Sequence, residues 1–168
     1  MYEDVQPHES LSQGDIIADC PVFGFDPAEP YAGLEADPER WELPVVVLTQ
    51  ACDLAETKTS RILVATIHVA EELVQAGAVK AAVVRNDIRR GRVYGWYFLP
   101  ACQQPITLPE SLVDLRDLHT VPKATLADLA RSGKRIGRII TPYREHLAQH
   151  FAVTYMRIGL PEPYETQP

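Results

Sequence analysis

The chain has 168 residues, of which 46% are hydrophobic and 23% charged, a composition that favours one ordinary globular domain over residues 1–168. No apolar run approaches the roughly 20 residues of a membrane span, and the N-terminus is acidic and polar, so we expect a cytoplasmic protein with no membrane segment. The three cysteines form no CxxC pair, which argues against a disulfide framework or a zinc knuckle. We expect no cofactor and no metal.

The net charge of -7 is distributed unevenly along the chain. Residues 1–60 hold 13 acidic and 2 basic side chains, net -11, whereas residues 61–168 hold 14 basic and 10 acidic, net +4. The total argues against broad electrostatic capture of nucleic acid. The densest basic stretches, 80–92 and 131–144, still permit a basic face, although a solvated surface is the commoner role of such runs.

The first half of the chain predicts strands. Segment 14–23, GDIIADCPVF, predicts the first strand, and the acidic, proline-rich stretch 24–43 predicts a long loop. The runs LPVVVLTQ at 43–50 and RILVATI at 61–67 are rich in β-branched residues and have the length of buried strands. We expect these two runs to form a central pair.

The second half predicts a mixture of helices and strands. Residues 69–90 favour one or two short helices interrupted near Gly77, and segments 93–99 and 112–118 favour strands. An amphipathic helix is expected at about 142–157, with Thr141 as its cap and Pro142 in its first turn. Its apolar positions repeat at i+4, and its end is marked by a glycine and a proline: Tyr143, Leu147, Phe151, Tyr155, Gly159 and Pro161.

These elements predict a mainly β fold of the α+β class. Short strands joined by turns favour a small closed or nearly closed barrel with inserted short helices. The C-terminal amphipathic helix is expected to pack across that barrel.

Three blocks of sequence, in this order, carry a family resemblance: QGDIIAD at 13–19, PVVVLT at 44–49 followed by LVATIH at 63–68, and ESLVDLRDLHTVPKATL at 110–126. Together they resemble the MazF/PemK family of toxin-antitoxin endoribonucleases. The resemblance implies an SH3-like barrel, a homodimer, single-stranded RNA as substrate, and an antitoxin or other protein partner. It covers about two thirds of the chain and leaves out 69–94 and the tail beyond Gly133.

The sequence departs from the family at two catalytic positions. The family places an arginine immediately before the Pro-Val-Val strand and a serine or threonine at the end of the next strand. Here Leu43 precedes Pro44, and His68 stands at the hydroxyl position. Arg40, three residues before Leu43, is the available substitute for the unmatched arginine.

Metal-independent RNA cleavage needs a base, an acid and a cation for the phosphate oxygens. His68 is suited to the acid or base role, and Arg61 and Arg40 to clamping phosphate, because guanidinium binds phosphate oxygens bidentately. Thr49 is the candidate for orienting the phosphate. The alternative is structural: two surface arginines, a core or capping histidine and a strand threonine.

Cys52 and Asp53 follow directly on a predicted buried strand and are further candidate cleft residues. A thiol beside a carboxylate can bind a metal with His68 or His119, or act as a nucleophile with a histidine. The negative charge of Asp53 opposes formation of a thiolate, and zinc-type ligand spacing is absent. We therefore expect Cys52 to be a buried structural residue, with Asp53 capping the turn.

His146 and His150 form an i, i+4 pair that could ligate a metal on one helix face, although exposure on the helix flank is the expected fate of both. Three functions stay open. The first is an RNA-directed, toxin-type protein with weak endoribonuclease activity. The second is a non-catalytic binding or regulatory subunit of a bacterial toxin-antitoxin or defence system. The third is a metal- or thiol-dependent enzyme centred on Cys52.

Overall fold

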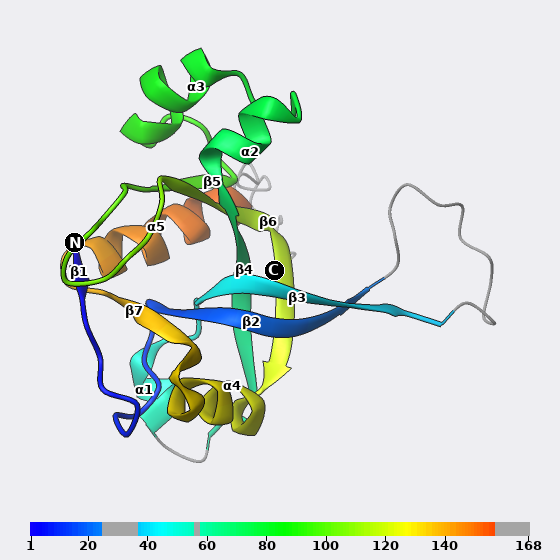
Figure 1. The fold of residues 1–168 in the computed structure, drawn as a ribbon, viewed down its shortest axis with the longest axis vertical. Coiled ribbons are helices and arrows are strands. Elements are labelled where there is room, and N and C mark those ends of the chain that lie inside the picture. The colour runs from blue at the N-terminus through cyan, green and yellow to red at the C-terminus, as the bar shows by residue number, and fades with distance from the viewer. Residues whose placement is uncertain (25–36, 56–57, 157–168) are drawn as a thin grey trace, which may run out of the picture.

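The computed structural model describes residues 1–24, 37–55 and 58–156. Seven strands form one sheet in the order β1-β7-β2-β3-β4-β6-β5, and every pairing is antiparallel (Figure 1). The strands are β1 (Tyr2–Glu3), β2 (Asp15–Gly24), β3 (Glu39–Val47), β4 (Arg61–Val69), β5 (Trp96–Leu99), β6 (Ser111–Pro122) and β7 (Arg135–Ile139).

Short helices connect and cover the strands. They are α1 (Ala51–Ala55), α2 (Ala70–Gln75), α3 (Ala81–Asn86), η1 (Ile88–Arg90), α4 (Lys123–Leu129), η2 (Ala130–Lys134) and α5 (Tyr143–Tyr155). The prediction of a mainly β, α+β fold with inserted short helices is confirmed. Gly77 lies between α2 and α3 with φ 74°, so the interruption predicted near this glycine is present. None of the helices in the described part of the chain has both the length and the apolar character of a membrane span.

Backbone pairing does not close the sheet into a barrel. Strands β1 and β5 stand at the two ends of the strand order, and no pairing joins them within the described residues. The two ends nevertheless come together, because the Tyr2 hydroxyl donates a 2.9 Å hydrogen bond to the carbonyl of Pro100, directly after β5. The result is a curled sheet with an open seam between β1 and β5.

The main core lies on the face of the sheet that α5 covers. Ile16 of β2, Val46 of β3 and Leu115 of β6 are fully buried there together with Leu147 of α5. Because β-strand side chains alternate between faces, their neighbours in sequence point to the opposite side. The predicted packing of the C-terminal helix against the sheet is therefore present.

The opposite face carries two smaller cores. One is covered by α1 and α4 and includes Leu54, Val64 and Leu126. The other lies under α2, α3 and η1 and includes Val84 and Ile88. The two helical layers stand at opposite ends of β4 and β6 (Figure 1).

The apolar stripe of α5 is narrower than its i+4 pattern predicts. Leu147 is fully buried and Phe151 half-buried, but Tyr143 and Tyr155 are exposed. The predicted Thr141 cap is wrong, since Pro142 is the cap residue and the Thr141 hydroxyl donates to Oε1 of Glu145 instead. The predicted stop at 159–161 lies outside the described residues, and α5 ends at Tyr155.

The boundaries of the predicted acidic loop, 24–43, are wrong at both ends. β2 extends to Gly24 and β3 begins at Glu39, and the two strands stay paired out to those residues. The central part of the loop, 25–36, lies outside the described residues. β1, α4, η2 and β7 are additional elements for which the sequence made no prediction.

A buried ionic network ties the N-terminal segment to β7. The Asp15 carboxylate accepts hydrogen bonds from both Arg135 and Arg138, and the side chains of Asp15 and Arg135 are almost fully excluded from solvent. The Arg135 guanidinium also donates to the backbone carbonyls of Gln6, Pro7, Glu9 and Ser10. Buried charges are stable only when paired and hydrogen-bonded, as these are. This network holds residues 6–10 on the sheet.

Candidate functional site

The structure does not bring His68 and Arg61 together. Arg61 begins β4 and His68 lies one residue from its end, so seven strand residues, about 23 Å, separate them. The Arg61 guanidinium is bound to the next strand, where Nη2 donates to the carbonyl of Thr120 at 2.6 Å and Nε to its hydroxyl. Arg61 therefore fastens β4 to β6, and no contact places it at His68.

Thr49 and Arg40 bond to other partners, and neither has a hydrogen bond or ion pair to His68 within the described residues. The Thr49 hydroxyl accepts a 2.8 Å hydrogen bond from the backbone N–H of Leu63, which fixes the chain just after β3. Arg40 lies in β3 rather than in a loop, and its guanidinium pairs with Glu42 at 2.7 Å on the exposed surface. Within the described residues, no hydrogen bond or ion pair joins any two of the four predicted catalytic residues.

Cys52 is exposed, so the prediction that it is a buried packing residue is wrong. It lies in α1, where its thiol is 3.7 Å from Oε1 of Gln50 and 3.9 Å from Oδ1 of Asp53. His119 pairs with Asp117 on β6. Within the described residues, no group of three or more His, Cys, Asp or Glu side chains is arranged to hold a metal ion.

His68 does have a distinctive neighbour on the outer face of the sheet. Its half-buried ring meets the edge of the Trp96 indole, with ring centroids 6.2 Å apart and planes at 71°. Thr66, two residues earlier on the same face, carries a hydroxyl, but that residue is fully buried. His68 is therefore the polar side chain at the end of β4 that remains accessible beside Trp96.

Arg116 of β6 packs against the same indole. Its guanidinium carbon is 4.7 Å from the centre of the Trp96 ring, within cation–π range. Its Nε and Nη2 each donate a 2.9 Å hydrogen bond to the Asp114 carboxylate, and these bonds raise the pKa of Arg116. The Arg116 side chain is 56% exposed, so its positive charge stays accessible to solvent beside the ring.

Gly95 creates the room for Arg116. A Cβ at this position would lie 2.9 Å from Cδ of Arg116, and the φ of Gly95 is 86°, which L side chains rarely adopt. The Gly95 carbonyl accepts a hydrogen bond from the N–H of Leu115, so the glycine is itself fixed in the sheet. A larger residue would strain the backbone and displace Arg116 from the Trp96 ring.

A second arginine–aromatic pair stands next to the first. Arg89 of η1 places its guanidinium carbon 5.5 Å from the centre of the Phe98 ring. Trp96 and Phe98 are two residues apart in β5, so their side chains share one face of the strand at a spacing of about 7 Å. We call Arg116–Trp96 and Arg89–Phe98 the paired platform.

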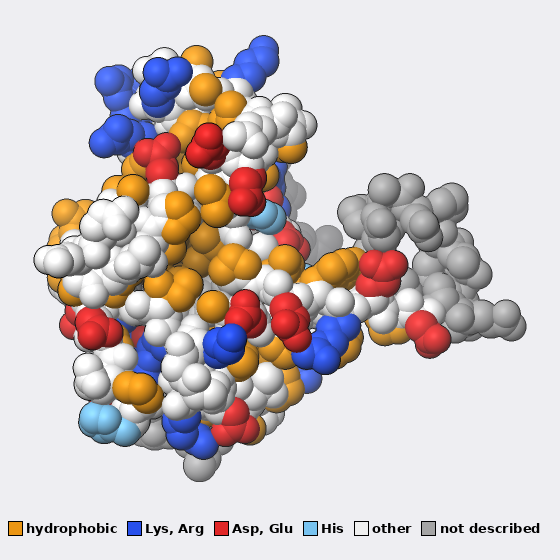
Figure 2. All heavy atoms as spheres, viewed as in Figure 1, with side chains coloured by type: hydrophobic (Ala, Val, Ile, Leu, Met, Phe, Trp, Pro, Cys, Tyr) orange, Lys and Arg blue, Asp and Glu red, His pale blue; other side chains and the backbone are white. Residues whose placement is uncertain are grey.

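The paired platform borders a basic part of the surface. Lys and Arg side chains gather at the end of the molecule formed by α2 and α3 (Figure 2). The stretch 80–92 supplies five exposed basic residues there: Lys80, Arg85, Arg89, Arg90 and Arg92. The negative charge of the whole chain is therefore offset locally at this end.

Sequence reasoning identified His68 but missed both members of the Arg116–Trp96 pair. Their contact depends on the register that places Trp96 opposite Asp114, and no local pattern encodes that register. One signal was present, because a glycine directly before a strand tryptophan indicates a close approach by another group.

The chain was also compared with known proteins. No model of a protein family matches it, and no curated protein matches it at a significant level.

Proposed function

We propose that this protein binds single-stranded RNA on the paired platform of β5. The proposal depends on one observation, the two solvent-accessible guanidinium groups held over adjacent, half-buried aromatic rings on one strand face. Unstacked RNA bases are recognised by stacking on aromatic rings and on arginine planes. The same arginines can neutralise phosphates, and the basic stretch 80–92 extends that charge along the surface.

The resemblance to the MazF/PemK family supports RNA as the ligand class. A toxin-type endoribonuclease and a non-catalytic RNA-binding subunit use the same surface in this proposal, and they differ in whether His68 acts on the RNA. Cleavage is expected to be weak or absent, because no arginine contacts His68 in the described structure and Arg61 is bound to Thr120. Loss of one positioned donor to the transition state typically costs about 100- to 1,000-fold in rate.

Binding can be measured by fluorescence anisotropy with a labelled, mixed-sequence single-stranded RNA at low salt. Arg116→Gln and Arg89→Gln should each weaken binding at least about fivefold, since stacking contributes about 1 to 3 kcal/mol per base. Gly95→Ala should weaken it too, although no charge changes. Arg131→Gln is the matched control, because it removes one exposed charge from η2, away from the platform.

Two results would contradict RNA binding at this surface. In the first, Arg131→Gln weakens binding as much as Arg116→Gln, which would mean that only total charge matters. In the second, the wild-type protein binds RNA no more tightly than an unrelated protein of similar acidity. Thermal denaturation of each variant controls for loss of the fold.

Cleavage is tested separately, with the same RNA in EDTA and analysis of the products on a gel. If products form and His68→Ala reduces their rate at least about tenfold, the protein is a metal-independent endoribonuclease. If RNA is bound and left intact, the protein is a non-catalytic RNA-binding subunit. Cleavage that persists in His68→Ala would remove His68 from the site.

A further inference from the structure

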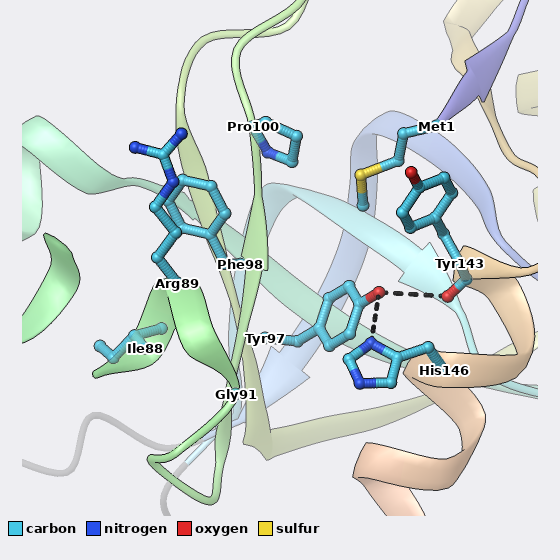
Figure 3. A pocket seen from close by; sticks show the side chains of 9 residues that line it. All are labelled: Met1, Ile88, Arg89, Gly91, Tyr97, Phe98, Pro100, Tyr143 and His146. Atoms are coloured by element: carbon cyan, nitrogen blue, oxygen red, sulfur yellow. Dashed lines mark hydrogen bonds between the residues drawn. The ribbon is translucent and has the colours of Figure 1, made fainter. Parts of the chain in front are cut away.

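A cavity of about 290 Å³ lies beside the free edge of β5, at the open seam of the sheet (Figure 3). Its walls include the rings of Tyr97, Phe98 and Tyr143, the thioether of Met1, and the side chains of Arg89 and His146. The RNA-binding residues Trp96 and Arg116 do not line it. The cavity therefore shares the Arg89–Phe98 pair with the paired platform but does not include the Arg116–Trp96 pair.

Two segments outside the MazF/PemK resemblance build this cavity. The insertion 69–94 contributes η1 with Arg89, and the tail beyond Gly133 contributes α5 with Tyr143 and His146. These segments are far apart in sequence, and β5 lies between them in the fold (Figure 3). The cavity is thus a feature that this chain adds to the part of the sequence resembling the family.

The polar atoms of the cavity are fixed. The Tyr97 hydroxyl donates a 3.1 Å hydrogen bond to the carbonyl of Tyr143, and Nδ1 of His146 lies 3.4 Å from the same hydroxyl (Figure 3). Because the hydroxyl proton is directed to the carbonyl, the contact with His146 requires a hydrogen on Nδ1. The second ring nitrogen of His146 then has no role in this pair and can bind a ligand.

Burial keeps Tyr97 neutral. Desolvation, reinforced by the neighbouring Tyr143, raises the pKa of Tyr97 to about 12. The phenol is therefore an anchor for His146 rather than a base. The anchor depends on its place in β5, where Tyr97 is packed in the main core.

His150 supports this pair from the next turn of α5. It is only 7% exposed, contrary to the prediction that it lies on the exposed flank, and its ring packs edge-on against Tyr97 at 5.9 Å and stacks on Tyr94 at 6.2 Å. Burial lowers the pKa of His150 and the nearby His146 adds to this, against an opposing effect of backbone groups at Val93 and Trp96. The buried Nε2 atom of His150 makes no hydrogen bond to any described residue.

The lining combines aromatic surface with positive charge. Arg89 brings a guanidinium to one side of the cavity, and Tyr143 and Met1 form the other side (Figure 3). Ligand pockets typically pair apolar and aromatic walls with a few placed polar groups, and about 290 Å³ is at the small end of their range. A guanidinium group binds carboxylates and phosphates through charge-assisted hydrogen bonds. Aromatic side chains favour ligands with an aromatic ring that can stack on them.

We propose that this cavity binds a small planar aromatic molecule carrying one anionic group. The aromatic ring packs against the wall formed by Tyr143 and Met1, a polar substituent contacts His146, and the anionic group pairs with Arg89. An aromatic carboxylate and a mononucleotide both have this chemistry. The proposal does not depend on RNA binding at the paired platform.

Isothermal titration calorimetry with 4-hydroxybenzoate and with UMP tests the site and distinguishes the two sources. The neutral controls are 4-hydroxybenzyl alcohol and uridine. At least one anion should bind, and its neutral control should bind at least about fivefold more weakly. Arg89→Gln and His146→Gln should each weaken binding at least about fivefold, whereas Arg90→Gln, the neighbouring exposed arginine, should not.

Arg116→Gln separates this site from the RNA platform, because it should reduce RNA binding and leave binding of the small anion unchanged. The proposal is overturned if neither anion binds at concentrations up to about 10 mM. It is also overturned if binding persists equally in Arg89→Gln and His146→Gln. Unfolding midpoints close to that of the wild type verify that both variants keep their fold.

Discussion

Asp15 should be one of the most sensitive positions for stability. Its carboxylate is fully buried and accepts hydrogen bonds from Arg135, 1% exposed, and from Arg138, 13% exposed. Removing one partner of a buried ion pair costs about 3 to 5 kcal/mol, because the other charge is left uncompensated. Arg135 keeps four backbone carbonyl partners, so Asp15→Ala is expected at the lower end, about 3 kcal/mol.

Urea denaturation at pH 7, followed by circular dichroism, measures this loss as a lower midpoint at an unchanged slope. The control is Asp128→Ala, which breaks the surface pair with Arg131, whose side chains are 72% and 66% exposed, and should cost less than about 1 kcal/mol. Adding Arg135→Met to Asp15→Ala should recover part of the stability, since it removes the stranded charge. A loss below about 1 kcal/mol for Asp15→Ala would refute the buried network as the anchor of residues 6–10.

Three further predictions concern the helix, its histidine and the thiols. Leu147→Ala should lower the free energy of unfolding by about 2 to 5 kcal/mol in the same assay, because Leu147 is fully buried. A smaller loss would mean that α5 does not cover the main core. Burial lowers the pKa of His150 in the folded protein below its usual value of 6.5. The neutral ring therefore contributes its full stabilisation above pH 6.5, and this stabilisation is lost as the pH falls from 6.5 through the pKa of the folded protein. The urea midpoint of the wild type should therefore fall more between pH 7.5 and pH 5 than that of His150→Asn, and equal falls would contradict a buried neutral ring. Cys52 should react with Ellman's reagent in the native protein while Cys20 stays unreactive, because burial raises the pKa of Cys20 to about 11. The half-buried Cys102 is removed from the comparison by Cys102→Ser, and a thiol that still reacts at the same rate when Cys52→Ser is added would contradict this assignment.

The strands were the most predictable part of the fold. Two apolar runs rich in β-branched residues form their centre, Val45 to Val47 and Ile62 to Ile67. Such runs favour strands that are buried on both faces of the sheet, and these residues, apart from the half-buried Leu63, are buried in the structure. By contrast, β7 was missed because Arg135 and Arg138 make the segment look like a charged surface. Only the distant Asp15 converts those arginines into buried residues, and that contact has no local signature.

The candidate site was less predictable for the same reason. His68 was named as a candidate from its place at the end of a strand, Arg61 because it begins that strand, and Arg40 because it lies near the position of the family's arginine. The pleat and length of β4 carry Arg61 away from His68, whereas the β5–β6 register brings in Arg116. Cys52 was expected to be buried because the strand before it is buried, yet the chain turns into α1 and exposes the thiol.

Photo-cross-linking with single-stranded RNA that contains 4-thiouridine tests the central claim most directly, because it reports where on the protein the RNA lies. After digestion, mass spectrometry should locate the cross-links in the segment 93–99, at Trp96 or Phe98, and Arg116→Gln should reduce them at least about fivefold. Cross-links confined to the other basic stretch, 131–144, or equally abundant in Arg116→Gln, would contradict RNA binding on the paired platform.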